Sequence, residues 1–232
     1  MTEAEQIRAR YARRAEQQLE KRYLETDPLN LRVVQERERA LISLLNRHLG
    51  VPAGEASAIE VGCGSGSNLA TLIRFGFAPQ NLVANELLED RVQLARNRLP
   101  PGVTILPGDA TLLDLPPGSF DIVYQSTVFS SLLQDDTQAN LAAAMWNWLK
   151  PGGGIIWYDF TYNNPMNRDV RGVPMKRIRE LFPDAEVDTR HITLAPPIAR
   201  RIPHQLYGLL NIRPLRTHVM CWLGKPAGLP RK

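Results

Sequence analysis

The chain has 232 residues, a mass of 26.1 kDa and a hydrophobic content of 44%, which suit one single-core domain and exclude two domains of ordinary size. A charged content of 22% and a mean hydropathy of −0.25 exclude a chain that is mainly disordered. No run approaches the roughly 18 consecutive apolar residues of a membrane-spanning helix, and residues 1–10 lack the apolar core of a secretory signal. We therefore expect a cytoplasmic protein.

Charge and cysteine content add two limits. The net charge of +4 is weak evidence for a nucleic-acid partner, but no acidic residue follows Asp188, so the C-terminal part is basic. That part either meets an anionic partner or forms a solvated basic edge. Cys63 and Cys221 are expected to be free thiols, because Cys63 lies in a glycine cluster where a disulfide would distort a tight turn.

Two helices are expected at the N-terminus. Residues 3–24 predict a charged helix with few apolar anchors, so it must lie on another part of the protein. Residues 31–49 carry a stronger apolar stripe, which ends at Gly50 and predicts a helix packed on the core. We divide the chain into these helices, residues 1–54, and one domain, residues 55–232.

From residue 57, short β-type runs alternate with helical runs. The expected strands are 58–61, 82–85, 103–106, 120–124 and 155–160, and the expected helices between them are 68–75, 89–99 and 134–149. A helix at 175–181, a strand at 185–193, an amphipathic stretch at 198–210 and a strand at 218–223 follow. This alternation predicts an α/β fold with a doubly wound, mostly parallel sheet, whose ligand crevice lies at the carboxyl ends of the strands.

A glycine-rich loop follows the first expected strand. Gly62, Gly64 and Gly66 allow a ligand to lie directly against the backbone at the start of the next helix. Their spacing is G-x-G-x-G, and Ser67 stands where a dinucleotide site has its third glycine. Glu60, two residues before the loop, suits a cationic amino group and would repel a pyrophosphate.

This combination resembles the first motif of class I S-adenosylmethionine-dependent methyltransferases. The resemblance implies a Rossmann-like sheet of seven strands, S-adenosylmethionine as cofactor and S-adenosylhomocysteine as product. It assigns the ribose hydroxyls to Glu86 and the adenine to Leu87, Asp109 and Ala110. A solvated surface acid is the alternative for Glu86, and a turn or helix cap for Asp109. The implied cofactor-binding residues are Glu60, Gly62, Cys63, Gly64, Ser65, Gly66, Asn68, Glu86, Leu87, Asp109, Ala110 and Gln125.

The last third of the chain resembles a narrower bacterial subgroup associated with polysaccharide and glycan biosynthesis, through its segments 156–165, 169–172, 181–183, 194–197 and 215–218. A turn at 149–154 matches the general family. The subgroup implies O-methylation of a free, nucleotide-linked or lipid-linked sugar, with residues 161–232 on the acceptor side. A Pro-Pro-Tyr sequence after the fourth strand is missing, which argues against nucleic acid. The expected substrate-binding residues are Tyr23, Ser130, Tyr158, Asn163, Asn164, Arg168 and Arg171.

Two residues are candidate general bases for such a reaction, which needs a proton acceptor close to the acceptor hydroxyl. Asp159 ends the fifth expected strand; alternatively it caps a loop or holds Arg168 or Arg171. His218 begins the last strand and is alternatively a structural histidine. The acidic residues show no further spacing typical of a metal site, so we expect none.

Two segments have open interpretations. The first helix either acts as a lid over the cofactor or simply packs, and residues 198–212 either rest on an anionic membrane or cover the acceptor pocket. Two other functions also remain: a nicotinamide-dependent oxidoreductase, which Ser67 disfavours, and a non-catalytic scaffold that keeps the fold.

Overall fold

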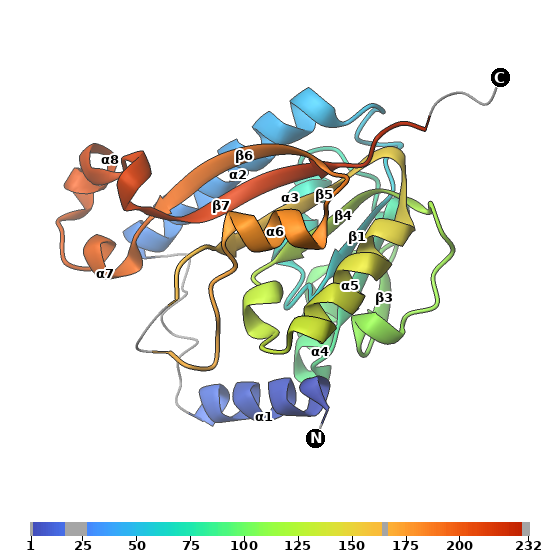
Figure 1. The fold of residues 1–232 in the computed structure, drawn as a ribbon, viewed down its shortest axis with the longest axis horizontal. Helices are drawn as coiled ribbons and strands as arrows, with labels where there is room; N and C mark the ends of the chain where they lie inside the picture. The colour runs from blue at the N-terminus through green and yellow to red at the C-terminus, as the bar shows by residue number, and fades with distance from the viewer. Residues whose placement is uncertain (1, 17–26, 164–166, 229–232) are drawn as a thin grey trace.

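A seven-stranded sheet runs through the centre of the computed structural model, which describes residues 2–16, 27–163 and 167–228 (Figure 1). The strands are β1 Ala58–Val61, β2 Leu82–Glu86, β3 Thr104–Pro107, β4 Phe120–Ser126, β5 Leu149–Phe160, β6 Glu186–Leu194 and β7 Arg216–Gly224. Their order is β3-β2-β1-β4-β5-β7-β6, and β7 is antiparallel to both of its neighbours. The expected doubly wound, mostly parallel sheet of seven strands is confirmed.

Helices cover both faces of this sheet. They are α1 Glu3–Glu16, α2 Pro28–His48, α3 Ser67–Arg74, α4 Glu89–Arg98, α5 Asp135–Trp148, α6 Met175–Leu181, α7 Pro196–Ala199 and α8 Tyr207–Leu210. Short 3-10 turns are η2 Pro79–Asn81, η3 Ala110–Leu112, η4 Phe129–Ser131, η5 His204–Leu206 and η6 Arg213–Leu215. Buried residues of α2, α3 and α4 pack on one face, and those of α5 and α6 on the other. None of the helices in the described ranges is long and apolar enough to cross a membrane.

Helix α2 is fixed at its start and along one side. The side chain of Asp27 caps it by accepting from the backbone N–H groups of Leu29 and Asn30, and Pro28 occupies the first helical position, where its missing N–H costs nothing. Buried residues such as Leu41 and Leu44 then hold the helix on the sheet. This anchoring sets the position of every other side chain on α2.

Three expected elements differ from the structure. The first helix is described only to Glu16, and its remaining expected residues lie outside the described ranges. The strand expected at 155–160 begins earlier, so the expected turn at 149–154 lies within β5, where the pairing with β4 shifts register and Gly152 has a φ of 82°. Gly154 leaves no room for a side chain, because a Cβ there would lie 2.1 Å from Trp222 Cε2. The stretch 198–210 divides into α7, η5 and α8 around Pro203, which has no N–H to continue a helix.

Candidate functional site

The glycine loop joins β1 to α3 and uses its three glycines for two purposes. All three have positive φ, which favours glycine: 63° at Gly62, 58° at Gly64 and 80° at Gly66. A Cβ on Gly62 would lie 2.6 Å from Val128 Cγ2, and one on Gly66 would lie 2.8 Å from Leu99 Cδ1. These two glycines therefore allow close packing, whereas Gly64 has open space beside it and is the position where a ligand can approach the backbone.

Glu60 lies fully buried beneath this loop with half of its carboxylate unsatisfied. Its Oε1 accepts from Asn68 Nδ2 at 2.6 Å, while its Oε2 is buried and has no hydrogen-bond partner among the described residues. Burial raises the pKa of Glu60 to about 8, although the Asn68 hydrogen bond and the nearby Arg37 act in the opposite direction. A buried carboxylate with one oxygen free is a binding site for a cationic donor.

Arg37 reaches the same place from α2. Its Nη2 donates to Asn68 Oδ1 at 2.8 Å, and its guanidinium lies 4.3 Å above the ring of Tyr158. Its Nε is buried and has no partner in the part of the chain that the structure describes. The amide of Asn68 thus joins an acid and a cation, and each of them keeps one unused hydrogen-bonding atom. This pair complements a ligand that carries both a positive and a negative group.

Sequence reasoning missed Arg37, although the sequence contains a signal for it. Val34, Arg37 and Leu41 follow one another at helical spacing, so the arginine interrupts the apolar face of α2. A charged residue within an apolar stripe needs a buried partner.

Glu86 closes β2 beside the glycine loop. Its Oε2 accepts from the backbone N–H of Gly64 at 2.8 Å and its Oε1 from that of Leu88 at 2.9 Å. The residue is only 5% exposed, so it is not a solvated surface acid. Each carboxylate oxygen keeps a further lone pair, and two backbone donors fix their direction. The side chain is therefore set to accept from two neighbouring hydroxyls.

A cavity of about 440 Å³ continues from this point past the ends of β2 and β3, lined by Arg8, Leu87, Leu88, Glu89, Asp90, Pro107 and Gly108. Asn85 donates from Nδ2 to the carbonyls of Leu106 and Gly108 and so fixes the backbone of Gly108, which lines the cavity. Asp109 caps η3, since its Oδ1 accepts from the backbone N–H of Thr111 at 2.9 Å. Ala110 beside it is 8% exposed. The structure therefore shows Asp109 as a helix cap, which was the alternative to its role as an adenine contact.

The remaining predicted cofactor residues contact the protein itself. Cys63 is buried, which raises the pKa of its thiol, and Ser65 Oγ accepts from Arg98 Nη1 at 3.1 Å. Gln125 is fully buried, and its Oε1 accepts from the backbone N–H of Val128 at 3.1 Å. Gln125 therefore holds the turn after β4.

Asp159 is fully buried and points at backbone donors. Its Oδ2 accepts from the N–H of Ser130 at 3.1 Å and its Oδ1 from that of Phe160 at 2.9 Å. Burial raises the pKa of Asp159 to about 7, against the effect of these hydrogen bonds. The carboxylate fixes the loop after β4, which is the capping alternative, and its hydrogen bonds within the described residues go to Ser130 and Phe160, not to Arg168 or Arg171. Ser130 is 1% exposed, and its hydroxyl donates to the carbonyl of Thr127, so it does not face an acceptor.

His218 stacks on Tyr158 with ring centroids 5.3 Å apart and an interplanar angle of 16°. Its Nδ1 lies 3.0 Å from Thr217 Oγ1, and burial lowers the pKa of the ring to about 4. The imidazole is therefore neutral near pH 7. Tyr158 itself is 4% exposed beneath Arg37, so the expectation that its ring face meets a sugar does not fit this position.

Asn163 and Arg171 lie near Ser130, because Arg171 donates from its backbone N–H to the carbonyl of Ser130 at 2.8 Å and Asn163 contacts the adjacent Gly172. Asn163 is exposed, and its Oδ1 accepts from the N–H of Gly172 at 2.9 Å, while Arg171 forms an ion pair with Asp135. Arg168 is exposed on the same segment. Tyr23 and Asn164 lie outside the described residues.

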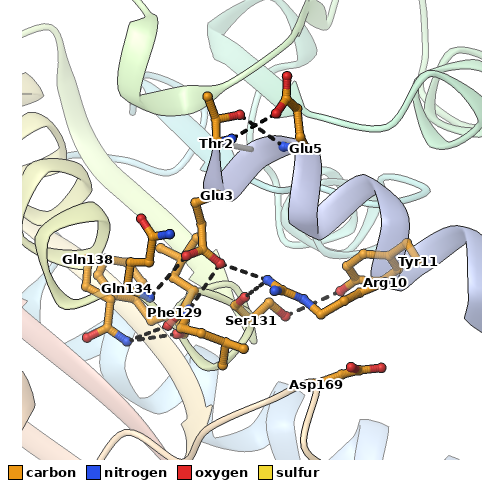
Figure 2. Close-up of polar contacts among 12 residues, drawn as sticks. Thr2, Glu3, Glu5, Arg10, Tyr11, Phe129, Ser131, Gln134, Gln138 and Asp169 are labelled. Carbon is orange, nitrogen blue, oxygen red and sulfur yellow. Dashed lines mark hydrogen bonds and ion pairs between the residues drawn. The ribbon is translucent and has the colours of Figure 1, made fainter.

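Helix α1 is anchored at the carboxyl edge of the sheet by a buried ion pair (Figure 2). Arg10 Nη2 donates to Glu3 Oε1 and to the carbonyl of Ser131, both at 2.8 Å. The Glu3 carboxylate also accepts from the backbone N–H groups of Leu133 at 3.2 Å and Gln134 at 3.1 Å. Because Arg8 of the same helix lines the cavity, α1 lies beside the cavity, where a lid would be placed.

Comparisons with known proteins show what this site is similar to. Residues 58–153 match a family model described as a methyltransferase domain. Over 95 residues the chain is 40% identical to the malonyl-[acyl-carrier protein] O-methyltransferase of Bacteroides fragilis; the match takes in 40% of this chain and spans 19% of the length of that relative.

Solved structures share the fold. A S-adenosylmethionine-dependent methyltransferase from Mesorhizobium loti is 16% identical with a TM-score of 0.60, and the match covers 82% of this chain and 96% of that one. A Pyrococcus horikoshii protein is 16% identical with a TM-score of 0.61, over 88% and 97% of the two chains. The chain thus has the Rossmann-like fold of class I methyltransferases, and the comparisons indicate S-adenosylmethionine as the cofactor.

Proposed function

We propose that the protein is a S-adenosylmethionine-dependent O-methyltransferase. The observation that carries this proposal is the pair of unused buried atoms, Glu60 Oε2 and Arg37 Nε, on either side of Asn68. The methionine part of the cofactor is a zwitterion, so its ammonium suits the carboxylate and its carboxylate suits the guanidinium. Glu86 is directed to accept from the two ribose hydroxyls, and the cavity past Leu87 has room for the base.

The cofactor supplies a methyl group on a positively charged sulfur, so the acceptor oxygen needs only to be aligned and free of its proton. Glu60 and Arg37 would hold the methionine part of the cofactor and Glu86 its ribose, so that the methyl group between them would be held in one orientation. Alignment of this kind provides a large part of the acceleration in a bimolecular transfer. Nδ1 of the neutral His218 lies 3.0 Å from Thr217 Oγ1, and in the tautomer in which Nδ1 donates to this hydroxyl, Nε2 is the nitrogen that can accept a proton.

A sugar hydroxyl is the acceptor that we propose first. The segment after β5 exposes Tyr162, whose side chain is 63% exposed, together with Asn163 and Arg168. An aromatic face, an amide and a guanidinium are the groups that suit a sugar and an attached phosphate. This segment also carries part of the resemblance to the glycan-associated subgroup.

A carboxylate is the second candidate acceptor, favoured by the 40% identity to an enzyme named as a malonyl-[acyl-carrier protein] O-methyltransferase. Incubation with methyl-labelled cofactor and two acceptor sets, sugars with their nucleotide-linked forms and malonyl thioesters, separates the two. A methyl ether survives mild alkali, whereas a methyl ester releases its label. Absence of cofactor binding by a folded protein, or binding of a nicotinamide dinucleotide in its place, would overturn the proposed function.

Cofactor binding should release a proton. Glu60 has a pKa of about 8 in the free protein, and contact with an ammonium lowers the pKa of a carboxylate. Below this value the free site therefore holds more protons than the occupied site. We expect the affinity for S-adenosylhomocysteine to rise by up to about tenfold per pH unit between about pH 6 and 8, and then to level off.

Calorimetry in buffers with different ionisation enthalpies measures the released proton directly. Adenosine is the matched control, because it lacks the amino-acid part and should bind with an affinity that does not change across this range. Proton uptake, or equal pH dependence for both ligands, would contradict the assignment of Glu60 to the ammonium.

A further inference from the structure

Residues 196–215 form a tip beyond the ends of β6 and β7, made of α7, η5, α8 and η6. In Figure 1 it projects at the left-hand end, away from α4 and α5. Three large apolar side chains of the tip are exposed: Leu206 by 42%, Leu209 by 74% and Ile212 by 52%. Exposed apolar residues that gather on one surface indicate an interaction site more strongly than scattered ones.

The tip is firmly built, so this exposure does not come from a loosely packed segment. Tyr207 donates from its hydroxyl to Glu36 Oε2 at 3.0 Å, and Asn211 donates from Nδ2 to Glu36 Oε1 at 2.8 Å. Arg216 Nη2 donates to the carbonyl of Asn211 at 2.7 Å. Other apolar residues of the tip, among them Ile198, Ile202, Leu210 and Leu215, pack inward around Tyr207. The tip therefore has one face that packs on the protein and one that meets solvent.

The tip that exposes these apolar residues also carries exposed cations. Arg200, Arg201 and Arg213 are all exposed, and no acidic residue occurs anywhere in the sequence after Asp188. An exposed apolar segment whose own charged residues are arginines complements a partner that is apolar within and anionic at its surface.

We propose that this tip binds the surface of an anionic membrane, with Leu206, Leu209 and Ile212 entering the boundary between headgroups and acyl chains. A bilayer fits better than an acidic protein because the apolar residues are aliphatic and lie on a projecting surface. Protein interfaces concentrate their binding energy in tyrosine, tryptophan and arginine seated in pockets. The tip follows the carboxyl end of β6, at the edge of the sheet that also holds the glycine loop. Binding would therefore bring the acceptor side of the domain close to lipid.

The test is flotation of the full chain with vesicles of phosphatidylcholine alone and with vesicles that also contain phosphatidylglycerol. The chain should bind only the second kind. Leu209→Glu should weaken binding by about tenfold or more, because it removes an inserted side chain and adds a repelled charge. Leu94→Glu on α4 is the matched control, since Leu94 is 52% exposed and lies outside the tip; it should bind as the unchanged protein does. Replacing Arg200 and Arg201 with Gln should also weaken binding by about tenfold or more.

Failure to bind the anionic vesicles overturns the proposal, and so does equal weakening by the Leu94 and Leu209 substitutions. Capture by an acidic protein without vesicle binding would likewise replace the membrane with a protein partner. The readout is independent of the proposed methyltransferase activity, because calorimetry with S-adenosylhomocysteine in the same preparations reports the state of the cofactor site separately.

Discussion

Replacing Glu60 with Gln should weaken S-adenosylhomocysteine binding by about 100-fold, because removing one member of a buried charge pair leaves the other without compensation. The ammonium of the ligand would meet an amide in place of the free Oε2. Stability should not fall with it. A carboxyl group whose pKa is raised from 4.5 to about 8 in the folded protein costs stability, which is lost as the pH rises from the lower to the higher value, and the loss is complete above about pH 8. A neutral Gln removes that cost.

Glu55→Gln is the control for this substitution, since it makes the same chemical change at an exposed position just before β1. Calorimetry should give unchanged affinity for Glu55→Gln, and thermal unfolding at about pH 8 should give a midpoint for Glu60→Gln no lower than that of the unchanged protein. Unaltered affinity in Glu60→Gln would show that Glu60 does not bind the ligand, and a lower unfolding midpoint would contradict the expected effect on stability.

Much of the fold follows from local sequence features. The strand at 58–61 agrees with β1 at both ends, and the helix at 175–181 agrees with α6, because runs of apolar residues and their periodicity are local signals. The end of β2 also placed Glu86 next to the glycine loop, since parallel neighbours bring their carboxyl ends together.

The contacts that complete the site depend on residues far apart in the sequence. Arg37 meets Asn68 across 31 positions, and Arg10 meets Ser131 across 121. The hydrophobic periodicity of a helix does not show which loop that helix packs against. Such residues were therefore missed, although a charge in the apolar stripe of α2 marked Arg37 as unusual.

The position of Asp159 illustrates a different limit. Successive residues of a strand point to opposite faces of a sheet, so the end of β5 offers two directions. Asp159 shares a face with Trp157, which packs in the cluster formed with α5 and α6, whereas Tyr158 packs with α2 on the face of Glu60. Asp159 lies near the carboxyl edge of the sheet, as predicted, but its side chain points to the backbone of Ser130 and not to an acceptor site.

Replacing Gly64 with Ala should show whether this glycine is needed for ligand binding or for packing of the loop. A Cβ at this position has no protein atom closer than Arg91 Nη1 at 3.8 Å, and the backbone N–H that donates to Glu86 is kept. The positive φ of 58° should cost about 1 kcal/mol of stability in an L-residue. Gly118→Ala is a matched control, with a φ of 65° and no atom within 4 Å of the added Cβ.

Both variants should therefore unfold at similar denaturant concentrations, slightly below that of the unchanged protein. Only Gly64→Ala should lose affinity for S-adenosylhomocysteine, by about tenfold or more, because the added methyl group occupies the space through which a ligand approaches the backbone. Equal affinities in the two variants would mean that the ligand does not lie against Gly64. A larger loss of stability in Gly64→Ala than in Gly118→Ala would mean that this glycine, like Gly66, is required for packing.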